Sequence, residues 1–281
     1  MTFDSRGGFL STDDVAHLLT TPDSLCWWCR NRQAATGEHK FKRSVLARLM
    51  GDGGDQVLMW GDGETLRELR GKSGITRDRY NVVKFPKSMC APCNNDRSQP
   101  FDFAYDVYAE HLHSYALLRK MPVMDFTQIY GTNWQDGVVE LARYHAKHFG
   151  CRMVRNGLPV PDSLRDFLNG AAEMPDAQMH VISTDTVHEK YKKGLSISPD
   201  FAAPNESGSE FSYYVMAAYI GSLGIRYEWR VDGEFSEESS SFFHYPQPVI
   251  THFRTEEDMA MRRPRKSGWF ARLALWAASG G

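Results

Sequence analysis

The chain has 281 residues, of which 42% are hydrophobic and 12% aromatic, so it can bury a sizeable core and has room for two domains. No apolar run approaches the ~20 residues that span a membrane as a helix. The N-terminus also lacks the basic-then-apolar pattern of a secretion signal, so we expect a cytoplasmic protein with no membrane partner. The net charge of −2 argues against a protein that binds nucleic acid indiscriminately.

The charges are distributed unevenly along the chain. Residues 26–97 contain 14 Lys and Arg against 8 Asp and Glu, whereas the rest of the chain contains 19 against 27. A basic segment inside an acidic chain indicates a surface that faces a polyanion. The alternative is an ordinary solvated face, and it is weakened because the basic excess coincides with two Cys-x-x-Cys motifs.

The first half of the chain predicts short helices and extended segments around two cysteine turns. Capping residues, apolar periodicity and Gly-rich stretches indicate where the elements lie. In chain order they are a helix over 11–19, a cysteine turn over 25–32, an extended piece over 38–42, a helix capped by Ser44 and ended by Gly51, a hairpin or loop insertion over 51–80, a strand over 80–85 and a helix after Cys93. The last helix carries an aromatic stripe, which we expect to face the core.

Beyond residue 120 the pattern changes to longer helices and several strands. A helix over 134–149 is expected to end at Gly150, because Gly is common directly after a helix. The other predicted elements are a helix over 161–168, strands over 178–182, 213–220, 225–231 and 248–253, and a short apolar helix over 269–276. We therefore predict an α+β protein with an N-terminal domain over 1–120 and a mixed α+β domain of unknown role over 121–281.

Four of the five cysteines form two Cys-x-x-Cys pairs, Cys26 with Cys29 and Cys90 with Cys93. Each pair can aim two thiolates at one point, and two pairs complete the tetrahedral four-sulfur shell that zinc prefers. The alternatives are two disulfides or four inert thiols, and disulfides fit a cytosolic chain poorly. We therefore predict one structural Zn2+. The remaining Cys151 is expected to be a buried, inert thiol.

Two short motifs accompany these pairs, Thr36-Gly37-Glu38-His39 and Cys90-Ala91-Pro92-Cys93-Asn94-Asn95. In these motifs the chain resembles the HNH endonucleases, and most closely the branch in which a four-cysteine zinc staples the active-site hairpin to its helix. The resemblance covers residues ~25–115, the size of a small domain, and does not extend into the C-terminal half. It implies a ββα-metal HNH module for that segment.

The resemblance also implies roles for individual residues. His39 stands where the family has the general base that deprotonates the attacking water, and His titrates near neutral pH as that role requires. Glu38 and Asn94 stand where the family binds its catalytic divalent ion. Their oxygen atoms suit Mg2+ or Mn2+, which would stabilise the charge that develops during phosphodiester hydrolysis.

Four basic residues lie close to these motifs in the sequence: Lys40, Lys42, Arg43 and Arg97. Each can bind a DNA phosphate, and each can equally be an ordinary solvated side chain. If they bind phosphates, they position DNA without reading its sequence, because phosphate contacts carry no sequence information.

One position departs from the family pattern. Phe85, five residues before Cys90, occupies the place of the Asn that orients the base. Asn81, Asn95 or a backbone carbonyl could orient His39 instead. The other histidines singled out have no ligand-like partner in the sequence and are expected to be structural: His111, His113, His145, His148, His180 and His188.

The sequence thus favours one function and leaves two alternatives open. We expect a metal-dependent endonuclease that hydrolyses DNA phosphodiester bonds with a His general base. One alternative is a non-catalytic zinc module that binds nucleic acid, in which Glu38 and His39 remain only as a signature of the fold. The other is an interaction protein with structural zinc, whose acidic C-terminal half contacts another protein or a second copy of the chain.

Overall fold

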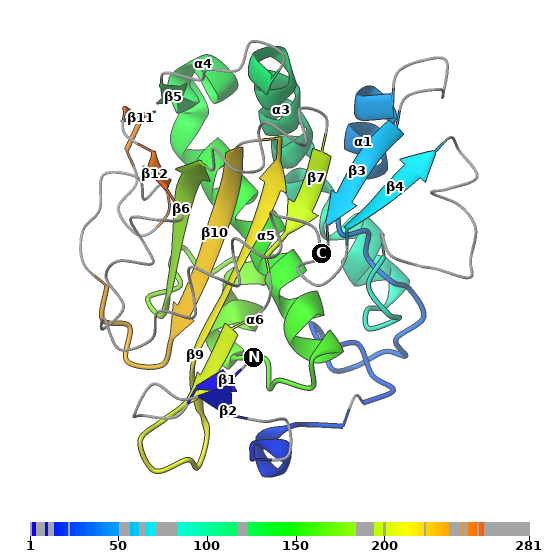
Figure 1. Cartoon of the computed structure of the whole chain (residues 1–281), viewed down its shortest axis with the longest axis vertical. Coiled ribbons are helices and arrows are strands. Elements are labelled where there is room, and N and C mark those ends of the chain that lie inside the picture. The colour runs from blue at the N-terminus through cyan, green and yellow to red at the C-terminus, as the bar shows by residue number, and fades with distance from the viewer. Residues whose placement is uncertain are drawn as a thin grey trace.

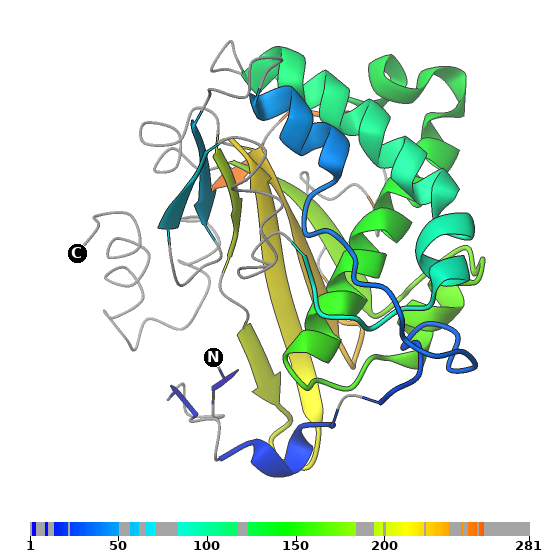
Figure 2. The ribbon, with the colours of Figure 1, turned by 90° about the vertical axis from the view of Figure 1, so that its right-hand side faces the viewer.

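The computed structural model describes residues 2–3, 9–10, 14–21, 23–50, 57–61, 66–70, 84–116, 123–183, 194–198, 201–221, 223–235, 243, 247–251 and 253–255. Within them, one large sheet carries the α-helices on a single face, seen from the front in Figure 1 and from the side in Figure 2. The mixed α+β class predicted from the sequence is confirmed. Among the described helices, none combines the length and the hydropathy needed to cross a membrane.

The sheet is built around an antiparallel hairpin of β9 (Phe211–Ile220) and β10 (Leu223–Arg230). The hairpin turns at Gly221, whose φ of 60° is unfavourable for residues with a Cβ. Both strands are rich in aromatic and β-branched residues, which suit a pleated, half-buried surface. The full strand order is β12-β6-β10-β9-β7-β3-β4.

The other strands are short and extend the sheet on both sides of this hairpin. On the main path they are β3 (Val57–Gly61), β4 (Leu66–Arg70), β6 (Ala177–Ser183), β7 (Gly194–Ile197) and β12 (Arg254–Thr255). Off that path β8 (Phe201–Pro204) pairs with β9, and β1 (Thr2–Phe3) joins β8 and β2 (Phe9–Leu10). A separate two-stranded sheet joins β5 (Met124–Asp125) to β11 (Val249–Ile250).

The helices are organised by α5 (Trp134–Arg155), which contacts both the sheet and α3 (Gln99–Ala116). Tyr105 of α3 stacks on Tyr144 of α5 with ring centroids 3.8 Å apart. The other helical elements are α1 (Arg43–Met50), α4 (Phe126–Tyr130), α6 (Asp162–Leu168), the 3-10 turns Ala16–Leu18 and Gly131–Asn133, and a π-helical turn over Pro92–Asp96.

Many of the predicted elements are confirmed. The hairpin expected within 51–80 is the antiparallel pair β3–β4, and β3 also pairs in parallel with β7, which the sequence did not indicate. The confirmed strands and helices are those predicted over 178–182, 213–220, 225–231 and 161–168 and the helix after Cys93. Residues 11–13, 51–56, 71–83 and 256–281, on which other predictions fell, lie outside the described residues.

The predicted end of the long helix at Gly150 is wrong. α5 continues through this residue to Arg155. Gly150 instead permits a close approach, because the ring of Trp27 lies where its Cβ would be. Glycine is therefore needed at position 150 so that Trp27 can pack against the helix, and not to end the helix.

Three further local predictions need correction. Ser44 lies inside α1 and does not cap it, because its Oγ donates to Asp106 Oδ1 at 2.6 Å. The N-terminal helix is reduced in the described residues to the 3-10 turn Ala16–Leu18. The strand predicted over 248–253 is replaced by the short strands β11 and β12.

The buried core runs without interruption from the cysteine motif to the sheet. Met89, beside Cys90, reaches α5 through Cys151, whose Sγ lies 3.5 Å from the Met89 Sδ. Burial raises the pKa of Cys151 to about 12, so the expected buried thiol stays protonated. The division into two domains at residue 120 stays a prediction.

Candidate metal centre

The four cysteines of the Cys-x-x-Cys pairs converge on one point. Their sulfur atoms all lie within 4.8 Å of one another, and all five cysteines of the chain are free thiols. Cys29 Sγ and Cys90 Sγ are 3.8 Å apart. Sulfurs around a tetrahedral zinc at the usual bond length are separated by about 3.8 Å. Cys26, Cys29, Cys90 and Cys93 could therefore hold a structural metal such as zinc.

Backbone hydrogen bonds shape the two turns that carry the sulfurs. In the first turn the Arg30 N–H donates to the Cys26 carbonyl at 2.8 Å, and Arg30 has a φ of 52°, in the left-handed region. In the second turn, Pro92–Asp96 is π-helical, and the Asn94 N–H donates to the Cys90 carbonyl at 3.0 Å. Turns of this kind are frequent at functional sites.

The four sulfurs share their protons unevenly. A hydrogen bond from Cys93 lowers the pKa of Cys26 to about 4. The same contact, together with burial, raises the pKa of Cys93, and burial raises that of Cys90. Cys26 therefore loses its proton more readily than Cys90 or Cys93. A bound zinc would replace the remaining protons, because the thiolate is the form that binds metal.

Arg97 lies beside the sulfur cluster. Its guanidinium stacks 4.5 Å above the ring of Trp28, and its Nη1 donates to Cys93 Sγ at 3.6 Å. Its Nη2 donates to Asn169 Oδ1 at 2.6 Å, and the same oxygen accepts from Trp28 Nε1 at 2.8 Å. Asn169, directly after α6, thus connects the metal centre to the C-terminal half of the chain.

The segment that carries Glu38 and His39 pairs antiparallel with the segment that leads to the second cysteine turn. His39 forms a bridge with Lys84, and the Phe85 N–H donates to the Glu38 carbonyl at 2.8 Å. Gly37 allows this approach, because a Cβ there would lie 2.4 Å from the carbonyl oxygen of Phe85. Along the chain, α1, β3 and β4 lie between these two extended segments, and α3 follows the second one after the π-helical turn.

The Glu38 carboxylate is buried between this segment and α5. Its Oε2 lies 3.4 Å from Lys147 Nζ, and its Oε1 lies 3.5 Å from His148 Nε2. The fully buried Lys147 also contacts Asp102 Oδ1 of α3 at 3.0 Å, and Ser98 Oγ donates to the other Asp102 oxygen at 3.1 Å. The ammonium of Lys147 lies between two carboxylates and offsets part of their negative charge, because buried charges need partners.

The pKa values of Glu38 and His39 follow from these neighbours. Burial by itself raises the pKa of Glu38, but the contacts with His148 and Lys147 outweigh it and lower the pKa to about 2. Burial, and then the charge of Lys84, lower the pKa of the half-buried His39, while Glu38 opposes the shift. His39 is therefore neutral at pH 7, the form in which an imidazole accepts a proton.

Asn94 offers a buried oxygen atom as a possible ligand. Its Oδ1 has no hydrogen-bond partner within the part of the chain that the structure describes. A buried acceptor without a donor costs about 1–3 kcal/mol. The Asn94 backbone carbonyl accepts from Ser98 Oγ at 2.7 Å, so Asn94 is linked through Ser98 to Asp102 and Lys147. An amide oxygen of this kind is the type of ligand that a hard cation takes.

The four basic residues singled out from the sequence have different surroundings. Lys40 is buried, and Lys42 forms an ion pair with Asp106 of α3. Arg43 and Arg97 are exposed. Their role in phosphate binding stays a prediction. Arg43 fits it best of the four, because its exposed group can reach a phosphate, whereas the guanidinium of Arg97 is held by Trp28 and Asn169.

Lys147 and His148 were not recognised as site residues from the sequence. No motif marks them, and His148 was expected to be structural. One signal was available, because Lys147 stands three residues after Tyr144 and four before Cys151, on the buried face of its helix. A lysine at such a position needs an acidic partner, although the sequence does not say which one.

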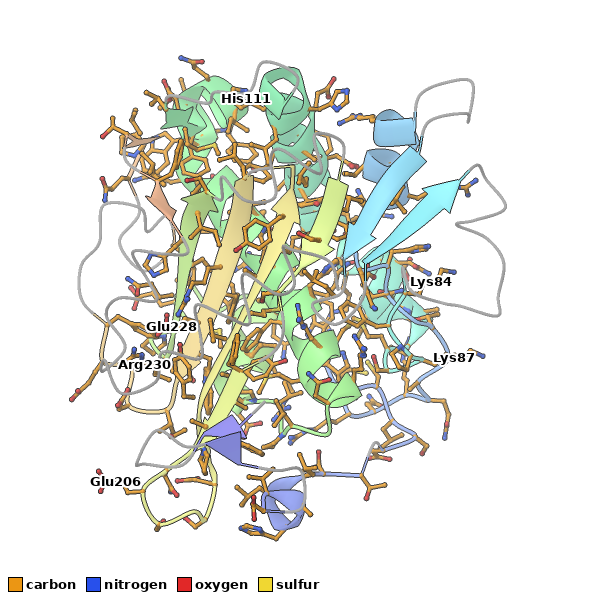
Figure 3. The ribbon with its side chains drawn as sticks, viewed as in Figure 1. Lys84, Lys87, His111, Glu206, Glu228 and Arg230 are labelled. Carbon is orange, nitrogen blue, oxygen red and sulfur yellow. The ribbon has the colours of Figure 1, made fainter. Side chains whose placement is uncertain are left out.

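A second buried group of charges lies on β10. Glu228 pairs with Arg226 at 3.0 Å and with Arg230 at 2.8 Å. Burial by itself raises the pKa of Glu228, but the two arginines outweigh it and lower the pKa. Figure 3 shows Glu228 and Arg230 on the opposite side of the molecule from Lys84 and Lys87. This group is therefore separate from the candidate site.

No protein-family model, no curated protein and no solved structure matches this chain. The class of protein rests on the geometry of the chain itself. In the described residues, the chain is a mixed α+β protein with four clustered cysteines that could hold a metal such as zinc.

Proposed function

We propose that the protein is a metal-dependent endonuclease that hydrolyses DNA phosphodiester bonds at a site of the HNH type. The observation that carries this proposal is the position of a neutral His39 on the segment that pairs with the approach to Cys90 and Cys93. The ββα arrangement implied by the resemblance is supported by the antiparallel pairing of these two extended segments, of which the second leads through Cys90 and Cys93 to α3, with α1, β3 and β4 inserted between them.

His39 acts as the general base in this proposal. Its neutral imidazole takes a proton from the attacking water, and such a base contributes about 10²–10⁴-fold to the rate. Glu38 and Asn94 would hold a divalent cation, Glu38 through its carboxylate and Asn94 through the buried Oδ1 that lacks a donor. When bound, Mg2+ or Mn2+ would stabilise the negative charge that develops on the phosphate and on the leaving oxygen.

The basic balance of residues 26–97 supports DNA as the substrate. Arg43 is exposed and can reach a phosphate, whereas Lys42 is held by Asp106 and Arg97 by Asn169. These contacts would supply affinity that depends on salt but not on sequence.

The experiment that tests the proposal is cleavage of supercoiled plasmid over a titration of Mg2+ and Mn2+, with the parent protein and three variants. His39→Ala should lose cleavage by about 10²–10⁴-fold and keep its zinc content and DNA binding, because a general base acts in the transition state. Glu38→Ala should raise the Mg2+ concentration needed for activity. His111→Ala is the matched control. Figure 3 shows His111 far from Lys84, the residue that forms a bridge with His39.

Two outcomes would contradict this function. His39→Ala that cleaves as well as the parent would exclude His39 as the base. A parent protein that binds DNA but cleaves with neither metal would exclude the nuclease.

One observation favours the second candidate, a non-catalytic zinc module that binds nucleic acid. Glu38 is buried and paired with Lys147 and His148, as a carboxylate with a structural role would be. Under this candidate Glu38→Gln lowers stability but leaves the affinity for DNA and its dependence on salt unchanged. Fluorescence anisotropy of labelled DNA over a series of salt concentrations measures both quantities.

A further inference from the structure

His148 is a buried histidine of α5 whose ring faces the candidate site from the C-terminal half of the chain. Its Nε2 lies 3.5 Å from Glu38 Oε1. That nitrogen makes no hydrogen bond within the described residues, although the side chain is almost entirely buried. A buried ring nitrogen this close to a carboxylate can act on the orientation of that carboxylate.

His148 lies beside the position at which the sequence departs from the HNH pattern. Phe85 stands where the family has a polar residue, and the ring of His148 packs edge-on against Phe85, with centroids 6.0 Å apart and an angle of 87° between the planes. A polar ring from α5 thus lies beside the position at which the sequence lacks a polar side chain.

The other oxygen of Glu38 is already fixed. Lys147, the neighbour of His148 in α5, contacts Oε2 at 3.4 Å and is itself held by Asp102. Each carboxylate oxygen has more than one lone-pair direction, so a carboxylate held by two side chains can still bind a cation. Partners of this kind set the orientation of a ligating carboxylate, and their loss typically costs 10–100-fold in metal affinity.

We propose that His148 is a positioning residue of the candidate site, which orients the Glu38 carboxylate for a divalent cation and so completes the site from the C-terminal half of the chain. This inference rests on the proposed function. It goes beyond it in assigning a role to a residue that lies outside the segment with the HNH motifs.

The chain offers a closely matched control. His145 lies three residues earlier in α5, is equally buried, and also has an Nε2 without a hydrogen-bond partner in the described residues. Its ring packs edge-on against Tyr105 and Tyr144, at centroid distances of 5.8 and 5.4 Å. Replacing either histidine by Phe keeps an aromatic ring and removes the nitrogens. His148→Phe removes a polar group beside Glu38, whereas His145→Phe removes one beside Tyr105 and Tyr144.

The test measures binding of Mn2+ alone to the full chain by electron paramagnetic resonance, without DNA and without turnover. His148→Phe should raise the Mn2+ dissociation constant by about 10–100-fold. His148→Gln, which keeps a side-chain donor, should recover most of the affinity. His145→Phe should bind as the parent does. Zinc content and circular dichroism verify that each variant is folded.

The outcomes separate this inference from the proposed function. An Mn2+ site that Glu38→Gln abolishes and His148→Phe weakens supports the inference even if DNA is never cleaved. The inference is overturned if folded His148→Phe binds Mn2+ like the parent, or if His145→Phe weakens binding equally. A parent protein without any Glu38-dependent Mn2+ site overturns it as well.

Discussion

Trp27 lies directly against the backbone of Gly150: a Cβ at position 150 would fall 2.3 Å from Cη2 of the indole. The first cysteine turn therefore touches α5 with no side chain of the helix between them. This contact and that of Asn169 with Arg97 join the metal centre to the C-terminal half at two separate places.

Gly150→Ala should destabilise the protein although alanine is the better helix former. Overpacking a tight contact costs about 1–3 kcal/mol, and the gain in helix propensity offsets about 1 kcal/mol, so we expect a net loss of up to about 2 kcal/mol. Urea unfolding with zinc in the buffer measures the change. In a Trp27→Ala background the same substitution should cost nothing, and an equal cost in both backgrounds would contradict the proposed contact.

The purified protein should contain one zinc per chain, and a Cys26→Ser/Cys90→Ser double variant should contain none. Isolated structural zinc sites contribute on the order of 10 kcal/mol to folding, so the double variant should also melt well below the parent. Elemental analysis and thermal unfolding check the two results. Cys151→Ala is the control, because it removes a buried thiol outside the cluster and should keep the zinc. A double variant that melts like the parent would show that the cluster is not structural.

Glu38 should make a contribution to stability that disappears in acid. Its pKa is lowered from 4.5 in the unfolded chain to about 2 in the fold, so its stabilising effect is complete above pH 4.5 and declines as the pH falls toward 2. The difference in unfolding free energy between the parent and Glu38→Gln should therefore shrink from pH 6 to pH 3, by up to about 2 kcal/mol. Comparing the two proteins at each pH cancels the effect of zinc release by acid. A difference that is constant with pH would place Glu38 outside the ion pair.

Arg43 and Lys42 should differ in their effect on DNA binding. Arg43→Ala removes an exposed charge and should reduce the slope of log K against log salt by about one. Lys42→Met should leave the slope unchanged and lower the melting temperature instead, because Lys42 is paired with Asp106. Anisotropy titrations over several salt concentrations decide between these outcomes. If Lys42→Met flattens the slope as much as Arg43→Ala, the ion pair does not hold in solution.

Local patterns were enough to predict several parts of this fold. The spacing of Cys26, Cys29, Cys90 and Cys93 predicts the cluster because a Cys-x-x-Cys turn can direct both sulfurs to one point. The strands β6, β9 and β10 follow from runs of β-branched and aromatic residues, which have few other stable conformations. In these cases, residues that are close together in the sequence indicate the local structure.

The parts that the sequence did not predict depend on contacts between distant segments. In the sequence, a glycine that ends a helix looks the same as one that makes room for a neighbouring ring. Only the tertiary structure shows that Gly150 packs against Trp27. Lys147 and His148 lie in an ordinary amphipathic helix, more than 100 residues after Glu38. Their importance comes from the carboxylate that packs against them, which helical periodicity cannot identify.

The parallel pairing of β3 with β7 affects how the chain can fold during its synthesis on the ribosome. The four cysteines have all left the ribosome soon after residue 93, whereas β7 and α5, on which their surroundings pack, emerge much later. Until then, β3 has an open edge, and an unpaired strand edge attracts other chains. Contacts of such long sequence separation also form slowly, because the loop between the strands must close first. Zinc bound by the cysteines cannot close this edge before β7 emerges, so association of chains through β3 during synthesis should not depend on the supply of zinc.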